Sequence, residues 1–266
     1  MIRPCCLTIA GSDSGGNAGV QADLRAFHAY GLHGCTVFAA LTAQNPFGVS
    51  AIHPVPADFV AAQLDAVLGV YSIKALKTGM LADPASIEVI AERLSEHPEI
   101  AKVIDPVMIA TSGAKLVSDE TVEIIKEMML PLATLITPNL PEAEVLAGVC
   151  GDGRAANVEW AEQLGRRLYE KFGCAVLVKG GHGDNSAAVD VLFDGHEIER
   201  FGAPWIANPV STHGTGCSLA AALAAEFALG RGVSAAVKGA KDYVHKAIEG
   251  SYYVGPDCGV LGFVEK

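Results

Sequence analysis

Basic side chains are scarce in this sequence. Lys and Arg number 19 against 30 Asp and Glu, which gives a net charge of −11, and no basic run reverses that balance locally. Proteins that hold the phosphate backbone of nucleic acids need a basic surface, so we expect no nucleic-acid partner. A small anionic ligand is still compatible with the sequence, because a pocket can carry a local potential opposite to the net charge.

Cysteine pairs with metal-binding or redox spacing are also missing. The seven cysteines are odd in number and form no C-x-x-C motif, which favours a mostly reduced, cytoplasmic protein. The N-terminus has no signal-peptide pattern, and no apolar run approaches the roughly 20 residues that span a bilayer. We therefore expect a cytoplasmic protein that has no membrane partner.

Aromatic residues make up only 6% of the chain, although half of it is hydrophobic. The core must therefore consist mainly of Ala, Val, Leu and Ile. A chain of 266 residues is long enough for one large α/β domain. Neither a linker, a charge block nor a repeat divides it, so we expect residues 1–266 to form a single domain.

Short apolar runs, polar turns and helical patterns alternate along the chain, which predicts a mainly parallel sheet with helices on both faces. An Asp-Gly pair between two further apolar runs predicts a small hairpin, whereas the C-terminal tail shows no regular pattern. In such folds, ligands bind at the carboxyl ends of the strands, where these polar turns converge. The expected strands are residues 5–10, 35–41, 73–76, 103–104, 135–136 and 175–178, the hairpin is 187–193 with 197–201, and the helices are 20–30, 56–70, 85–94, 118–129, 157–172 and 233–250.

The stretch Ser211–Leu223 combines Gly214, Thr215, Gly216 and Cys217 with an Ala-rich, apolar helix pattern. Small residues at a helix N-terminus let an anion approach unpaired backbone N–H groups. The helix dipole would also lower the pKa of a thiol in the first turn. Alternatively, this is a glycine-rich turn before a core helix with an inert cysteine, and the stretch alone does not decide between the two readings.

Several polar residues follow expected strands. Asp105 is a candidate Mg²⁺ ligand, and Asn139 and Glu142 are spaced to share one side of a helical turn. Alternatively, Asn139 and Glu142 form a helix capping box, and both functions are compatible. Lys179 precedes two glycines and is suited to nucleotide phosphates, or is simply an exposed lysine at the end of a strand.

A second group of residues suits a small polar heterocycle. The planar amide of Gln44 matches an aminopyrimidine edge, and Gly11 and Asp23 are compatible neighbours. Met80 and Val107 could cover the faces of a ring. Taken singly, Met80 and Val107 are more typical of a core, and Asp23 of a solvated carboxylate in the first turn of a helix.

Seven motifs occur in an order that resembles the hydroxymethylpyrimidine/phosphomethylpyrimidine kinases of thiamine biosynthesis, in the ribokinase-like superfamily. The resemblance implies a three-layer ribokinase-like fold, an ATP- and Mg²⁺-dependent phosphotransferase with an alcohol acceptor, and a homodimer. The motifs are AGSDSGGNAGVQADL (10–24), LTAQN (41–45), KTGML (77–81), DPVM (105–108), TPNLPEAE (137–144), LVKGGH (177–182) and STHGTGC (211–217).

Carried over by position, the resemblance implies two groups of site residues. It assigns the pyrimidine site to Gly11, Asp23, Gln44, Met80, Val107 and Cys217. It assigns the ATP and Mg²⁺ site to Asp105, Asn139, Glu142, Lys179, Thr212 and the 214–216 loop, with Asp105 and Glu142 nearest the metal. Cys217 stands where much of the superfamily has an aspartate base. Asn17 and Pro46 depart from the usual Gly and Thr.

These assignments imply in-line transfer of the ATP γ-phosphoryl group to a hydroxymethyl oxygen, with Cys217 taking the hydroxyl proton. A second phosphorylation, of the monophosphate, is implied by the family, and Ala110–Lys115 is either a flap over the phosphates or a surface loop. The alternatives are a pyridoxal or pyridoxine kinase and a non-catalytic pyrimidine-binding regulator. The joint presence of Asp105, Lys179 and Cys217 counts against the regulator.

Overall fold

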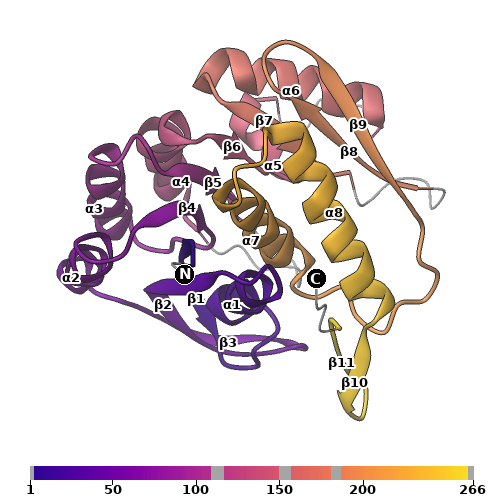
Figure 1. Cartoon of the computed structure of the whole chain (residues 1–266), viewed down its shortest axis with the longest axis horizontal. Coiled ribbons are helices and arrows are strands. Elements are labelled where there is room, and N and C mark those ends of the chain that lie inside the picture. Colours follow the sequence, from indigo (N-terminus) through magenta and orange to yellow (C-terminus); the bar gives the residue numbers. More distant parts are fainter. Residues whose placement is uncertain (1–2, 109–116, 150–156, 181–186, 263–266) are drawn as a thin grey trace.

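The computed structural model describes residues 3–108, 117–149, 157–180 and 187–262. Its main feature is a nine-stranded sheet in the order β3-β2-β1-β4-β5-β6-β7-β8-β9 (Figure 1). Strands β2, β1, β4, β5, β6 and β7 are parallel, and β3, β8 and β9 join antiparallel at the two edges. This confirms the expected mainly parallel sheet.

The strands follow the predicted apolar runs closely. The hairpin predicted around Asp194-Gly195 is present as β8 and β9. The bounds are β1 Cys5–Asp13, β2 His33–Asn45, β3 Gly48–Pro54, β4 Ile73–Thr78, β5 Ala101–Ile104, β6 Leu135–Ile136, β7 Ala175–Val178, β8 Ala187–Phe193, β9 Ile198–Pro204, β10 Tyr252–Gly255 and β11 Cys258–Val260.

The helices also begin and end near the predicted residues. The helix predicted to reach Met129 is α-helical only to Ile124 and continues as a π-helical turn, Ile125–Met129, and a 3₁₀ turn, Leu130–Leu132. The α-helices are α1 Gly19–Ala29, α2 Ala57–Leu68, α3 Pro84–Ser95, α4 Asp119–Ile124, α5 Leu140–Ala147, α6 Val158–Phe172, α7 Thr215–Ala228 and α8 Val233–Glu249.

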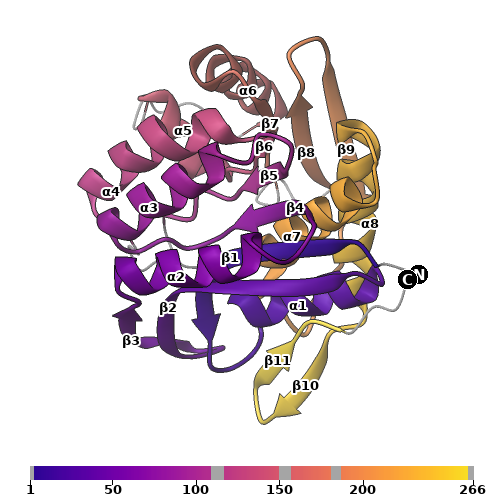
Figure 2. The same cartoon turned by 60° about the vertical axis from the view of Figure 1, so that its left-hand side comes forward.

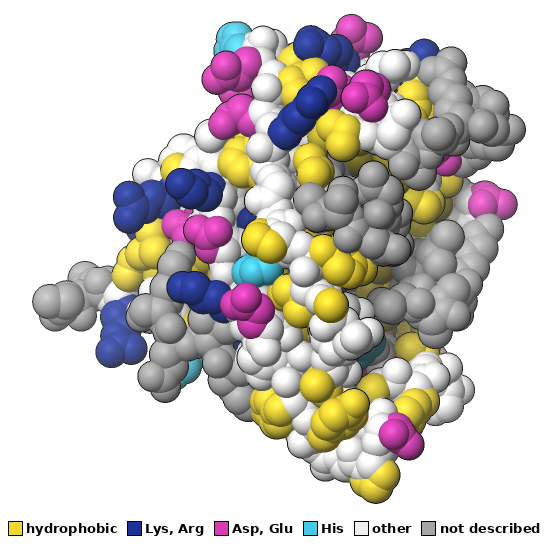
Figure 3. Space-filling view, turned by 90° about the vertical axis from the view of Figure 1, so that its right-hand side faces the viewer, with side chains coloured by type: hydrophobic (Ala, Val, Ile, Leu, Met, Phe, Trp, Pro, Cys, Tyr) yellow, Lys and Arg dark blue, Asp and Glu magenta, His cyan; other side chains and the backbone are white. Residues whose placement is uncertain are grey.

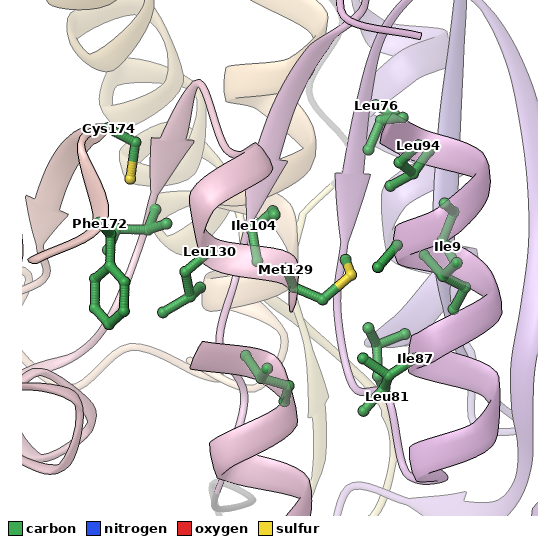
Figure 4. Close-up of a cluster of buried hydrophobic side chains, with 14 of the residues drawn as sticks. Ile9, Leu76, Leu81, Ile87, Leu94, Ile104, Met129, Leu130, Phe172 and Cys174 are labelled. Atoms are coloured by element: carbon green, nitrogen blue, oxygen red, sulfur yellow. The ribbon is translucent and has the colours of Figure 1, made fainter. Parts of the chain in front are cut away.

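Helices cover both faces of the sheet (Figure 2). Alternating strand residues separate the core into two clusters, because successive side chains in a strand point to opposite faces. One cluster packs against α2, α3 and the helices up to α6, and includes Ile9, Leu76 and Ile104 (Figure 4). The other lies against α1, α7 and α8. Five alanines of α7 are fully buried, and their small side chains let this central helix lie close to the sheet.

Two predictions about local structure were wrong. The stretch from Thr42 to Asn45 is not a turn: β2 continues through it and pairs with β3, a strand that the sequence pattern did not reveal. The C-terminal tail is not without regular structure, since β10 and β11 form a hairpin that projects from the body (Figure 2). Strands β3 and β10 are largely exposed, so burial leaves no clear pattern in their sequences.

Candidate active site

The carboxyl ends of the parallel strands border one cavity of about 1140 Å³. Of the residues assigned from the sequence, all except Asp23 line it. The cavity contains the proposed heterocycle residues and the proposed phosphate residues in one continuous space. Those lining it are Gly11, Gln44, Met80, Val107, Asp105, Asn139, Glu142, Lys179, Thr212, Gly214, Thr215, Gly216 and Cys217.

The anion loop, residues 212–217, opens helix α7. Gly214 is the N-cap residue and has a left-handed conformation, with φ of 89°. A Cβ on Gly214 would lie 2.0 Å from the carbonyl oxygen of Asn17, so only glycine fits there. Among the described residues, the amides of Gly216 and Cys217 have no backbone acceptor outside the helix. The loop therefore presents unpaired N–H groups at the positive end of the α7 dipole.

Cys217 points into a buried, charged environment. Burial raises the pKa of this thiol, and the carboxylates of Asp23 and Asp105 raise it further, whereas the Lys77 ammonium lowers it. The expectation that Cys217 has a lowered pKa was therefore wrong, because loss of hydration raises it. At neutral pH, Cys217 is a thiol in the unliganded protein.

Asp105 and Lys179 form an ion pair at the floor of the cavity. Lys179 Nζ lies 2.8 Å from Asp105 Oδ1, which also accepts a hydrogen bond from Thr137 Oγ1 at 2.9 Å. Burial alone would lower the pKa of Lys179, but Asp105 and Glu142 raise it overall, so the ammonium is charged. Lys179 is thus an oriented cation rather than a free surface side chain.

Asn139 and Glu142 form the predicted capping box of α5. Asn139 Oδ1 accepts from the Glu142 N–H at 2.9 Å, and Glu142 Oε2 accepts from the Asn139 N–H at 2.8 Å. Burial raises the pKa of Glu142, Lys179 opposes this, and Asp105 adds to it. The structural role of the pair is thereby confirmed, while both side chains still border the cavity.

Asp23 does not line the cavity, which corrects its assignment to the pyrimidine site. Its carboxylate is fully buried behind the wall, where it accepts hydrogen bonds from Thr8 Oγ1 at 2.6 Å and from Lys77 Nζ at 3.1 Å. Lys77 comes between Asp23 and the cavity, and Asp23 raises the pKa of Lys77 against the effect of burial. Asp23 is thus the counterion of Lys77 and does not contact the space available to a ligand.

Sequence reasoning assigned no role to several charged residues that line the cavity, among them Lys77, Asp190 and Lys241. Lys77 stands near the carboxyl end of β4, in the motif KTGML, and this position is a signal that could have found it. Asp190 and Lys241 form a 2.6 Å ion pair on the cavity wall, but they come from distant segments with no motif. His213, which was not assigned to the site from the sequence, also lines the cavity. The proposed flap at 110–115 and His182 lie outside the described residues.

Comparisons with known proteins agree with this geometry. The family model described as "Phosphomethylpyrimidine kinase" matches residues 13–261. The chain belongs to the phosphomethylpyrimidine kinase family. It is 43% identical to a hydroxymethylpyrimidine/phosphomethylpyrimidine kinase of Synechococcus elongatus, over 98% of each chain. It is also 46% identical to the thiamine biosynthesis bifunctional protein ThiED of Geobacter sulfurreducens, over 92% of this chain and 49% of that protein. The chain thus spans about half the length of such bifunctional relatives.

Solved structures confirm the ribokinase-like fold that the sequence resemblance implied for this family member. A pyridoxal kinase of Bacillus subtilis, solved as an ADP complex, has a TM-score of 0.89 and 33% identity, covering 99% of this chain and 98% of that one. A phosphomethylpyrimidine kinase of Clostridium difficile has a TM-score of 0.81 and 36% identity, covering 92% and 100%. The structural neighbours of this chain therefore include a phosphomethylpyrimidine kinase and a pyridoxal kinase solved as an ADP complex.

Proposed function

We propose that this protein transfers the γ-phosphoryl group of ATP to the hydroxymethyl oxygen of 4-amino-5-hydroxymethyl-2-methylpyrimidine, and then phosphorylates the resulting monophosphate, in thiamine biosynthesis. The observation that carries the proposal is the single cavity in which Gln44, Met80 and Val107 share a space with Lys179 and the anion loop. An acceptor ring and a triphosphate can therefore meet there without a change of site.

The heterocycle end of the cavity suits an aminopyrimidine. Gln44 offers a hydrogen-bond donor and an acceptor on one planar amide, and Met80 and Val107 provide apolar contacts for the ring faces. Gly11 lies beside Met80, and a Cβ there would lie 2.8 Å from Met80 Cε. A side chain at position 11 would therefore displace the end of the Met80 side chain.

The opposite end of the cavity suits a purine. It is lined mainly by apolar side chains from β8, β9, the segment 205–209 and α8, together with the Asp190–Lys241 ion pair. Such a mixture of apolar surface and a few polar groups is typical of nucleotide base sites. We place the adenosine of ATP here, so that its phosphates extend toward Lys179.

Catalysis by this chain consists mainly of positioning and charge stabilisation, as is general for phosphoryl transfer. The free amides of Gly216 and Cys217 would hold the equatorial oxygens of the migrating phosphoryl group. Lys179 would bind phosphate oxygens from the other side, held in place by Asp105. Cys217 would orient the acceptor hydroxyl. Lys77 is the neighbouring cation whose charge opposes the rise in the pKa of Cys217.

The carboxylates of Asp105 and Glu142 fit a sparsely ligated Mg²⁺. They line the same cavity and each is close enough to affect the other electrostatically. No group of three or more His, Cys, Asp or Glu in the described ranges forms a metal cage by itself. Phosphate oxygens and water would have to complete the coordination, which is the usual arrangement for Mg²⁺ in kinases. When bound, the ion neutralises charge on the phosphates.

A pyridoxal kinase is the second candidate, and the Bacillus subtilis neighbour favours including it. Release of ADP should be measured with the hydroxymethylpyrimidine, with its monophosphate, with pyridoxal, and without acceptor. We expect ADP release with both pyrimidines at a kcat/KM well above that with pyridoxal. Faster reaction with pyridoxal would reverse the assignment, and binding without ADP release would instead support a regulator.

The homodimer is a proposal that rests on the family resemblance, and the cytoplasmic location is a proposal that rests on the cysteine pattern. In the parts of the chain that the structure describes, no helix is long and apolar enough to cross a membrane. Acidic and basic side chains are interspersed on the face shown in Figure 3, with no basic patch among its described residues. Sedimentation of the purified protein would test the dimer, and a monomer at micromolar concentration would contradict it.

A further inference from the structure

His213 connects two parts of the pyrimidine end. It directly precedes Gly214 of the anion loop, and its Nε2 lies 3.4 Å from the terminal atom of the Gln44 carboxamide that the structure places as Nε2. The His213 Nε2 also lies 3.9 Å from Asp13 Oδ2. Since Gln44 is the residue that would contact the substrate ring, the hydrogen-bond partners of its carboxamide decide which edge of the amide faces the ring.

Thr42 Oγ1 lies 3.2 Å from the other terminal atom of the Gln44 carboxamide, which the structure places as Oε1. The oxygen and nitrogen of an amide are assigned from their hydrogen-bond partners, and here those partners favour the amide turned over. Thr42 Oγ1 is also only 2.7 Å from the carbonyl oxygen of Ser12. A carbonyl oxygen can only accept, so the single hydroxyl proton of Thr42 is used there. Toward Gln44, Thr42 must then act as an acceptor. The carboxamide atom that faces it must be the NH₂ group, because the hydrogen-bond partners decide how an amide is oriented.

The carboxamide oxygen of Gln44 consequently faces His213 Nε2, which has to carry a proton to donate. Asp13 favours that tautomer. It is buried, and it accepts backbone N–H groups of Gly15, Asn17 and Ala18 at 2.7–2.8 Å. Although burial acts in the opposite direction, these hydrogen bonds and His213 lower the pKa of Asp13 to about 2, so a carboxylate faces the ring.

We propose that His213, protonated on Nε2, and Thr42 together lock the Gln44 carboxamide in one orientation, which makes His213 a positioning residue for substrate specificity. An amide has two N–H donors and two acceptor lone pairs. Thr42 takes one donor and His213 one lone pair, so one donor and one lone pair remain for the substrate.

The locked amide distinguishes an amino group from an oxo group on the ring. A 4-aminopyrimidine presents a ring nitrogen that accepts and an amino group that donates, which complements the remaining donor and lone pair. The 4-oxo analogue presents a ring N–H and a carbonyl oxygen instead, and would need the amide turned over. In the turned amide, the carboxamide oxygen would face Thr42 Oγ1, so that two acceptors meet. The carboxamide NH₂ group would face the protonated Nε2 of His213, so that two donors meet.

The inference rests on the proposed function and is tested by the selectivity between these two substrates. The quantity is the ratio of kcat/KM for 4-amino- and 4-oxo-5-hydroxymethyl-2-methylpyrimidine in wild type, His213→Leu, His213→Gln and Thr42→Val. In wild type we expect a ratio on the order of 10², the effect of mispaired buried hydrogen bonds. His213→Leu and Thr42→Val should each reduce it by about tenfold or more, through KM for the pyrimidine, with KM for ATP unchanged.

His213→Gln provides the matched control, because a glutamine amide nitrogen can donate from close to the position of Nε2. It should restore most of the ratio, which a merely structural role of the ring would not do. The proposal is overturned if either His213→Leu or Thr42→Val keeps the wild-type ratio. If His213→Leu does not fold, Thr42→Val decides, since it acts from the opposite side of the amide. Failure of wild type to phosphorylate the amino substrate would instead refute the proposed function.

Discussion

Gly214 is the residue on which the anion loop most depends. Its positive φ and its contact with the Asn17 carbonyl exclude any side chain. We expect Gly214→Ala to reduce kcat by roughly 10²–10³, the cost of losing a preorganised donor site. Steady-state ADP release measures this.

Gly202→Ala is the control for that substitution, because a Cβ at Gly202 in β9 meets no atom within 4 Å. It should keep wild-type kcat. The role given to the loop is contradicted if Gly214→Ala folds and turns over normally. Gly216 is a weaker test, since a Cβ there would only touch Lys179 Nζ at 3.8 Å.

Cys217 gives a prediction about pH. Because burial raises its thiol pKa, the thiolate fraction should stay small at pH 7 and grow only above the range of an ordinary cysteine. We expect its alkylation by iodoacetamide, followed by peptide mapping, to increase mainly above pH 9. Lys77→Met should move the profile to higher pH, because the cation that favours the thiolate is gone. Fast alkylation at pH 7 would refute this description of the thiol.

At the scale of elements, two helix caps offer a matched comparison. Asp83 caps α3 through the Ser86 N–H at 2.9 Å, and Asn139 caps α5 through the Glu142 N–H at the same distance. Asp83→Ala and Asn139→Ala should each lower the free energy of unfolding by about 1 kcal/mol. Urea unfolding measures this effect.

Only Asn139→Ala should also lower kcat/KM for ATP, because its helix start carries Glu142 and borders the cavity, whereas Asp83 is not among the lining residues. If both variants lost the same fraction of kcat/KM for ATP, or if neither variant lost any, the capping box would have no function beyond stability. The comparison thus tests whether Asn139 and Glu142 contribute to ATP binding as well as to the helix cap, two roles that the sequence allowed together.

The elements also show what the sequence could predict. Buried strands such as Ala175–Val178 and capped helices such as Pro84–Ser95 have strong local signals, and their bounds were predicted within a few residues. The exposed strand Gly48–Pro54 has no apolar run, so only its pairing with β2 defines it. This edge strand was missed because backbone pairing with β2, and not a sequence pattern, makes it a strand.

At the scale of the whole molecule, the convergence of the site follows from topology. Parallel strands place their carboxyl ends at one edge of the sheet, so residues as distant in sequence as Gly11 and Cys217 line one cavity. The motifs at the strand ends were sufficient to predict that these residues converge on one cavity. The ion pair that buries Asp23 behind Lys77 was not predictable, because it depends on the depth of α1 relative to β4. Charge environments such as that of Cys217 depend equally on three-dimensional packing.

The central claim is that the amides at the start of α7 hold the transferred phosphoryl group beside Cys217 and Lys179. A crystal structure with AMP-PCP and the hydroxymethylpyrimidine tests it most directly. The account predicts γ-phosphate oxygens within about 3 Å of the Gly216 and Cys217 amides and the acceptor hydroxyl beside Cys217 Sγ. A triphosphate that ends elsewhere in the cavity, with the 214–217 amides facing only solvent, would contradict it.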